Sequence, residues 1–281
     1  MTQVHSASFN IGIGKIQADI ELTLNSPHAV KLWLGRPANY RKNVFPIIGI
    51  GDYFEAVNRI VESAKQDDPY GDWWLMLVEN KIDHAEHRIK QVEAALTERR
   101  GEVIHKQLKV GASTNPCPFR APVNIDTPQG FMGLYQLIKF DELAVAIDLA
   151  RRMAVLESHE VSMWGRYAAG GLRSLFYYAA AFHYSGANRR DFLMNNARAR
   201  RALARFGALP PEVLEGAMRS RFAPDHWRAM PTLPVAGAGE TLWESLARSA
   251  REGSSMEMVS DLDFDATSAP DTGVAYVDDN A

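Results

Sequence analysis

The clearest alternation of apolar and polar positions lies between residues 69 and 101. Apolar residues recur there at intervals of three and four, at Leu75, Val78, Ile82, Ala85, Ile89, Val92 and Leu96. This is the spacing of a heptad repeat, and it predicts one long amphipathic helix. We expect the rest of the chain to be organised around this helix.

The residues that flank the stripe are typical of helix ends. Asp68 can cap the N-terminus, Pro69 suits the first helical position, and Asp72 would complement the positive end of the helix dipole. Gly101 predicts the C-terminus. Together with Asp67, the two acids at the start could instead bind a cation, although capping is the commoner role of such residues.

A period-two alternation predicts strands on either side of the long helix. Residues 16–24 place apolar side chains on one face, and the outer face carries Gln17, Asp19, Glu21 and Thr23. Residues 103–110 predict a second strand, with His105, Gln107 and Lys109 on its outer face. Because residues 119–125 contain Pro122, that segment can be at most an edge strand. The sequence therefore predicts a small antiparallel sheet.

The remaining pattern is helical. Further helices are predicted at residues 28–34, from an Asp52 cap to Ala64, from Pro128 with a break near Asp141, at 160–183, 191–206 and 211–218. Gly170 and Gly171 indicate either close helix packing or a break. The predicted fold class is mainly α with a small antiparallel β element (α+β), a helical bundle around one long helix.

The predicted domain organisation follows composition. Residues 1–14 are expected to form a flexible N-terminus, residues 15–230 a single α-rich domain with a small β-sheet, and residues 231–281 a disordered tail with a possible short helix at 240–251. From Met256 onward the chain has seven acids and no Lys or Arg, against a net charge of −3 for the whole chain. The body is therefore mildly basic and the tail acidic, which permits contact with a polyanion.

The sequence offers little support for catalysis. His84 and His87 could begin a metal site on one helix face, but no matching second cluster exists and a solvated helix face is the more frequent role. Gly12 to Lys15 lacks the full spacing of a phosphate-binding loop, and no nucleophile motif is present. Cys117 is the single cysteine. We therefore predict a non-enzymatic protein without metal or cofactor and, since no signal peptide or membrane span is visible, a cytoplasmic one.

An arginine-rich segment is the strongest candidate for binding. Residues 189–205 carry six arginines and one acid, and helical spacing puts Arg198, Arg201 and Arg205 on one face. Arginine suits contact with phosphate groups. The alternative is a solvated face that pairs with acids elsewhere in the fold.

The run DDPYGDWW at residues 67–74 resembles a known family. It is similar to the integrating conjugative element proteins, a family that includes the AcaB-like regulators of conjugative plasmids. The run TPQGFMGLYQLIKFDEL at residues 127–143 and the segments 185–191 and 208–210 add to the resemblance, which covers about residues 16–228. The resemblance implies a transcriptional regulator of ribbon-helix-helix character, which dimerises and places a two-stranded ribbon in the major groove of DNA.

The first functional hypothesis is thus a homodimeric DNA-binding regulator of conjugative transfer genes that binds double-stranded promoter DNA. Its candidate DNA-binding residues are Gln17, Thr23, Arg36, Arg41, Lys42, His105, Gln107, Lys109, Arg198, Arg201 and Arg205. The alternative is a protein–protein adaptor of the conjugation or maintenance machinery that reaches other element-encoded proteins through residues 240–281. Neither hypothesis involves a membrane.

Overall fold

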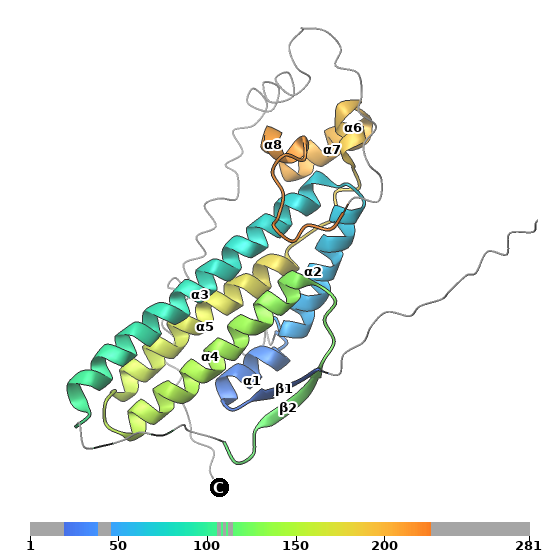
Figure 1. Ribbon diagram of the computed structural model, residues 1–281. Coiled ribbons are helices and arrows are strands. Elements are labelled where there is room, and N and C mark those ends of the chain that lie inside the picture. Colours follow the sequence, from blue (N-terminus) through green and yellow to red (C-terminus); the bar gives the residue numbers. More distant parts are fainter. Residues whose placement is uncertain (1–19, 39–45, 106–107, 109–110, 112–114, 226–281) are drawn as a thin grey trace, which may run out of the picture.

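The long helix is the axis of the computed structural model, which describes residues 20–38, 46–105, 108, 111 and 115–225 (Figure 1). The elements follow in the order β1 (Ile20–Leu24), α1 (Pro27–Leu34), α2 (Ile50–Lys65), α3 (Pro69–Val103), β2 (Phe119–Val123), α4 (Pro128–Arg152), α5 (Ser158–Ala180), α6 (Arg189–Leu193), α7 (Ala197–Phe206) and α8 (Pro211–Leu214). The predicted fold class, mainly helical with a small antiparallel sheet, is confirmed.

The bundle packs around α3, whose 35 residues span about 52 Å at 1.5 Å per residue. All seven residues of its predicted apolar stripe are buried. Short turns connect α2 to α3 and α4 to α5, so these pairs run antiparallel (Figure 1). Gly71 brings the start of α3 against the end of α2, because a Cβ there would lie 2.6 Å from the Ala64 nitrogen. Gly171 likewise lets α5 approach the middle of α3, because a Cβ there would lie 2.9 Å from the Ala85 Cα.

The sheet consists of β1 and β2, which pair antiparallel with Leu22 opposite Ala121. Leu22 and Leu24 face the core, whereas Glu21 and Thr23 are exposed, as the alternation predicts. A buried carboxylate fixes the turn from β1 to α1, since Asp141 of α4 accepts the backbone N–H groups of Asn25 at 2.8 Å and Ser26 at 2.7 Å. The sheet is thereby attached to the bundle.

The predicted strand at 103–110 is wrong where the structure describes it. The long helix continues through Gly101 to Val103, and Ile104, His105 and Leu108 lie outside any strand. Gly101 does not adopt the positive φ of a C-cap and has no close neighbour that would force the helix to end. The partner of β1 is instead the predicted edge strand, which the structure extends from Phe119 to Val123.

Three helix boundaries also differ from prediction. The predicted break near Asp141 is absent, and α4 is continuous through this residue. The Asp141 carboxylate accepts backbone N–H groups of the β1–α1 turn and does not compete for those of its own helix. Asp52 is not the N-cap of α2 but the third helical residue, and it accepts the Gly49 N–H at 3.3 Å. The predicted helix at 191–206 is two helices, because Asn195 has a φ of +45° and Asn196 caps a new helix.

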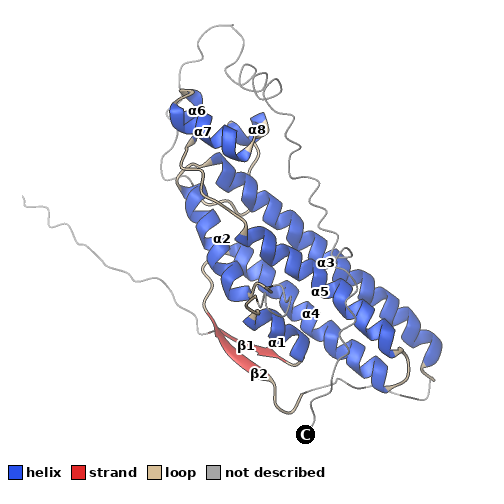
Figure 2. Cartoon of the chain, turned by 180° about the vertical axis from the view of Figure 1, so that it is seen from behind, coloured by secondary structure: helices blue, strands red, loops and turns tan. Residues whose placement is uncertain are grey.

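Helices α6, α7 and α8 form a small unit at the end of the bundle where α2 meets α3 (Figures 1 and 2). Its hydrophobic cluster is made of Ala187, Phe192, Ala199, Ala202, Leu209 and Leu214, together with Tyr70 from α3. We call this unit the corner unit (residues 187–218). Its last helix ends at Leu214, four residues before the predicted end.

The predicted flexible N-terminus at 1–14, the tail at 231–281 and its possible helix at 240–251 lie outside the described residues. In the part of the chain that is described, none of the helices has the length and apolar character needed to cross a membrane.

Candidate nucleic-acid interface

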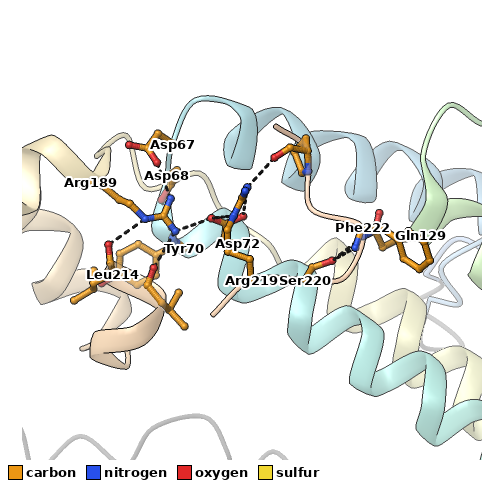
Figure 3. A network of polar contacts seen from close by, with 12 residues as sticks. Asp67, Asp68, Tyr70, Asp72, Gln129, Arg189, Leu214, Arg219, Ser220 and Phe222 are labelled. Atoms are coloured by element: carbon orange, nitrogen blue, oxygen red, sulfur yellow. Dashed lines mark hydrogen bonds and ion pairs between the residues drawn. The ribbon is translucent and has the colours of Figure 1, made fainter. Parts of the chain in front are cut away.

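A buried arginine attaches the corner unit to the bundle (Figure 3). Arg189 is 2% exposed, and its guanidinium contacts Asp67 and Asp72 at 2.6 Å each. It also donates to the carbonyl oxygens of Val213 at 2.9 Å and Leu214 at 3.0 Å, so it bridges the start of α3 and helix α8. A buried charge of this kind is tolerated because its hydrogen-bonding groups have partners.

Asp72 is the second centre of this network. Its carboxylate is fully buried and receives two further hydrogen bonds of 3.0 Å from Arg219, in addition to the bond from Arg189. The sequence predicts only a dipole-complementing acid at this position. Asp72 does lie in the first turn of α3, and it also pairs with two arginines more than 100 residues away in the chain.

The other residues of the DDPYGDWW run are also structural. Asp68 caps α3 by accepting the Tyr70 N–H at 2.9 Å, as predicted, and burial raises the pKa of its carboxyl against the lowering effect of hydrogen bonds from Ser185 and Ser63. The Tyr70 ring packs between Phe192 and Phe206 of the corner unit. The run therefore positions α6 and α7, and the residues that resemble the family are not themselves a chemical site.

Helix α7 presents its arginines to solvent. Ala199 and Ala202 are buried against the corner unit, while Arg198, Arg201 and Arg205 are exposed on the opposite side. We call these three residues the α7 arginine face. None of them forms an ion pair with a carboxylate of the described residues. The alternative from the sequence, pairing with acids elsewhere in the fold, is therefore not found within the described ranges.

The structure separates the predicted strand residues from the α7 arginine face. Thr23 is exposed on the sheet, and the Arg36 backbone pairs with Ile47 just before α2 begins. The corner unit lies at the other end of α2 (Figures 1 and 2). Helix α2, which has 16 residues and is about 24 Å long, lies between the two groups. His105 is remote from both, directly after the C-cap of the long helix.

The candidates Gln17, Arg41, Lys42, Gln107 and Lys109 lie outside the described residues. In the described part of the chain, no group of three or more His, Cys, Asp or Glu side chains could hold a metal ion. His84 and His87 are exposed on α3.

Sequence reasoning missed a second group of arginines, which comes from three distant parts of the chain. The guanidinium of Arg173 lies near those of Arg36, Arg88 and Arg166, and burial together with these three charges lowers its pKa. We call these four residues the arginine cluster. Only Arg36 was a candidate, because no spacing in the sequence connects residues of different helices.

The family model described as "Transcriptional regulator AcaB" matches residues 12–226. Among solved structures, the crystal structure of selenomethionine-containing AcaB from uropathogenic E. coli is similar at 14% sequence identity, with a TM-score of 0.42, over 71% of this chain and 96% of that chain. No curated protein matches.

Proposed function

The chain belongs to the family of the transcriptional regulator AcaB, and from this premise we propose that it regulates transcription by binding double-stranded DNA. We further propose that it acts as a homodimer on promoters of conjugative transfer genes, within an integrating conjugative element. The observation that supports DNA binding best is the α7 arginine face, an exposed helix surface that carries positive charge without acidic partners among the described residues.

The chemistry of α7 suits phosphate contact. Its ten residues include four arginines and no acid. Each guanidinium offers a planar set of donors that can bind two phosphate oxygens at once. The helix is held in a fixed orientation by the Arg189 network and by the Asn196 cap, which accepts the N–H groups of Arg198 at 2.9 Å and Ala199 at 3.1 Å. Arginines on a rigid element lose less conformational entropy when they bind.

The family resemblance supports a role for β1 in reading the bases. Strand, helix and helix follow one another as β1, α1 and α2, which is the order of a ribbon-helix-helix unit. Within the described residues β1 pairs on one edge with β2 of the same chain, and the exposed face of this ribbon carries Thr23 opposite Arg120. A major groove is about 12 Å wide. Since the length of α2, about 24 Å, lies between α7 and this end, we assign α7 to the phosphate backbone and not to the same groove.

Fluorescence anisotropy with labelled promoter DNA of the element, titrated across salt, tests the proposal. We expect a complex at low salt whose log affinity falls steeply with log salt concentration. Arg201→Glu should weaken binding by about tenfold or more and reduce the salt slope by about one. The matched control is Arg99→Glu, an equal change of charge on an exposed residue near the opposite end of α3.

Two outcomes would count against the proposal. If the wild-type protein forms no complex at low salt, DNA binding is wrong and the adaptor hypothesis becomes the better account of the chain. If Arg201→Glu and Arg99→Glu weaken binding equally, the protein binds DNA only through its overall charge, and the assignment of α7 to the phosphates is wrong.

A further inference from the structure

Four arginines gather on the bundle at a point remote from α7. Arg36 follows α1, Arg88 belongs to α3, and Arg166 and Arg173 belong to α5. Arg36 and Arg166 are exposed, whereas Arg88 and Arg173 are half-buried. The group therefore reaches the surface, but part of it is held by packing.

Arg88 is held in place by features of α5. Gly170 and Gly171 lie where its side chain crosses this helix, because a Cβ at Gly170 would stand 2.8 Å from Arg88 Nη1 and one at Gly171 3.4 Å from Arg88 Cδ. The guanidinium carbon then lies 4.4 Å from the centroid of the Tyr167 ring. A glycine within a helix costs stability relative to alanine. Two consecutive glycines at this crossing provide the room that the arginine needs.

Arg173 runs back along its own helix toward Arg166. Its Nη2 donates to the Arg166 carbonyl oxygen at 3.3 Å, and the Arg166 Nε donates to the Ser162 carbonyl oxygen at 3.1 Å. These contacts keep the two cations at the same surface as Arg88. Since arginine stays protonated in proteins, the cluster holds several like charges close together.

Three of the four arginines have no carboxylate partner within the described part of the chain. Arg88, Arg166 and Arg173 form no ion pair with any acid there. The contrast within the same protein is informative, because the buried Arg189 has two aspartates and two carbonyl oxygens. The guanidinium groups of Arg88, Arg166 and Arg173, which have no carboxylate partner among the described residues, are available to an external anion.

We propose that the arginine cluster is a second phosphate-binding surface, which contacts the backbone of the same DNA that α7 binds. This inference rests on the proposed function. Guanidinium groups match phosphate oxygens in geometry, and a polyanion supplies several phosphates to a surface that carries several cations. A cluster near the α2 N-terminal end would extend the contact from the corner unit along the bundle, so that the DNA lies along its length.

The test compares two double variants by anisotropy with the promoter duplex across salt. Arg166→Gln with Arg173→Gln should lower the slope of log affinity against log salt by about two and weaken binding by tenfold or more at 0.1 M salt. Arg151→Gln with Arg152→Gln removes the same charge from exposed positions that already pair with Asp148, and should leave the slope unchanged. Circular dichroism checks the folding of each variant.

A single-site variant keeps the inference testable if the double variant fails to fold. Gly170→Ala leaves the net charge unchanged but displaces the end of the Arg88 side chain, and should weaken DNA binding severalfold without loss of helical content. If the wild-type protein does not bind DNA, the proposed function and this inference are both wrong. If Arg201→Glu weakens binding while the cluster variants behave like the Arg151/Arg152 control, only this inference is wrong.

Discussion

Replacing Arg189 by methionine should detach the corner unit from the bundle. Methionine keeps the apolar stem of the side chain but removes the guanidinium, which contacts Asp67, Asp72 and two carbonyl oxygens (Figure 3). Breaking a buried ion pair costs about 3–5 kcal/mol, because the remaining charge loses its partner inside the protein. Arg219 still bonds Asp72, so we expect the lower end of that range, about 3 kcal/mol.

The loss should be local before it is global. The corner unit has its own hydrophobic cluster and meets the bundle mainly around Tyr70 and the Arg189 network. A loss of about 3 kcal/mol raises the population of a detached state by about two orders of magnitude, since 1.4 kcal/mol corresponds to a factor of ten. Hydrogen exchange measured by mass spectrometry should therefore become faster in peptides from residues 189–214, with little change in peptides from α3.

The neighbouring arginine provides the control. Arg190 is exposed on α6, so Arg190→Met makes the same chemical change without touching the network. It should leave the exchange of the corner unit as in the wild-type protein. If Arg189→Met and Arg190→Met exchange at the same rate as the wild type, Arg189 does not attach the corner unit. If Arg189→Met accelerates exchange equally in α3, the unit is not separable from the bundle.

Three further predictions concern stability. In thermal unfolding, Gly171→Ala should lower stability by about 1 kcal/mol, because the added Cβ would lie 2.9 Å from a backbone atom of α3. Gly170→Ala should be neutral or stabilising in the same measurement, because its Cβ meets only the end of an arginine side chain. Asp141→Ala should cost about 2–3 kcal/mol in urea unfolding, since two backbone N–H groups of the β1–α1 turn lose their acceptor; an unchanged midpoint would contradict the role assigned to this acid. Hydrogen bonds from Lys139 of α4 and Lys90 of α3 lower the pKa of Glu86. The stability that the ionised carboxylate adds is therefore present above the pKa of an unfolded glutamate, and it is lost as the pH falls through the lower pKa of the folded state. Glu86→Gln should therefore reduce the difference in unfolding free energy between pH 7 and pH 3 by at most about 1 kcal/mol, because the pair is partly exposed; no reduction would contradict the ion pair.

The local pattern determined the long helix and its cap. The heptad stripe, the Asp68 cap and the Pro69 start all depend on neighbours within a few positions, and each is present in the structure. Ser26 likewise caps α1 through a local bond, because its hydroxyl accepts the Ala29 N–H at 3.1 Å. Hydrophobic periodicity reports which face of an element is buried, so it is a sufficient guide where one stripe meets one core.

Prediction failed where a segment with a regular local pattern found no partner in the fold, and where a residue bonded to a distant segment. The alternation at 103–110 is as good as that of a strand, but β1 pairs with residues 119–123 instead. Asp141 has the local character of a helix break, yet its hydrogen-bonding capacity is taken up by a turn more than 100 residues away. A sequence pattern cannot reveal such bonds, because they form only after distant segments pack.

The sequence by itself determined the helical character, the central helix and the presence of an arginine-rich segment. Only the tertiary structure decided what each arginine does. Arg189 and Arg190 are adjacent in sequence, but one is buried among aspartates and the other is exposed. Arg88 and Arg173 are 85 positions apart, yet the charge of Arg88 helps to lower the pKa of Arg173. The physical reason is that the function of a charged side chain depends on burial and on the charges within a few ångströms, and both are set by packing between elements.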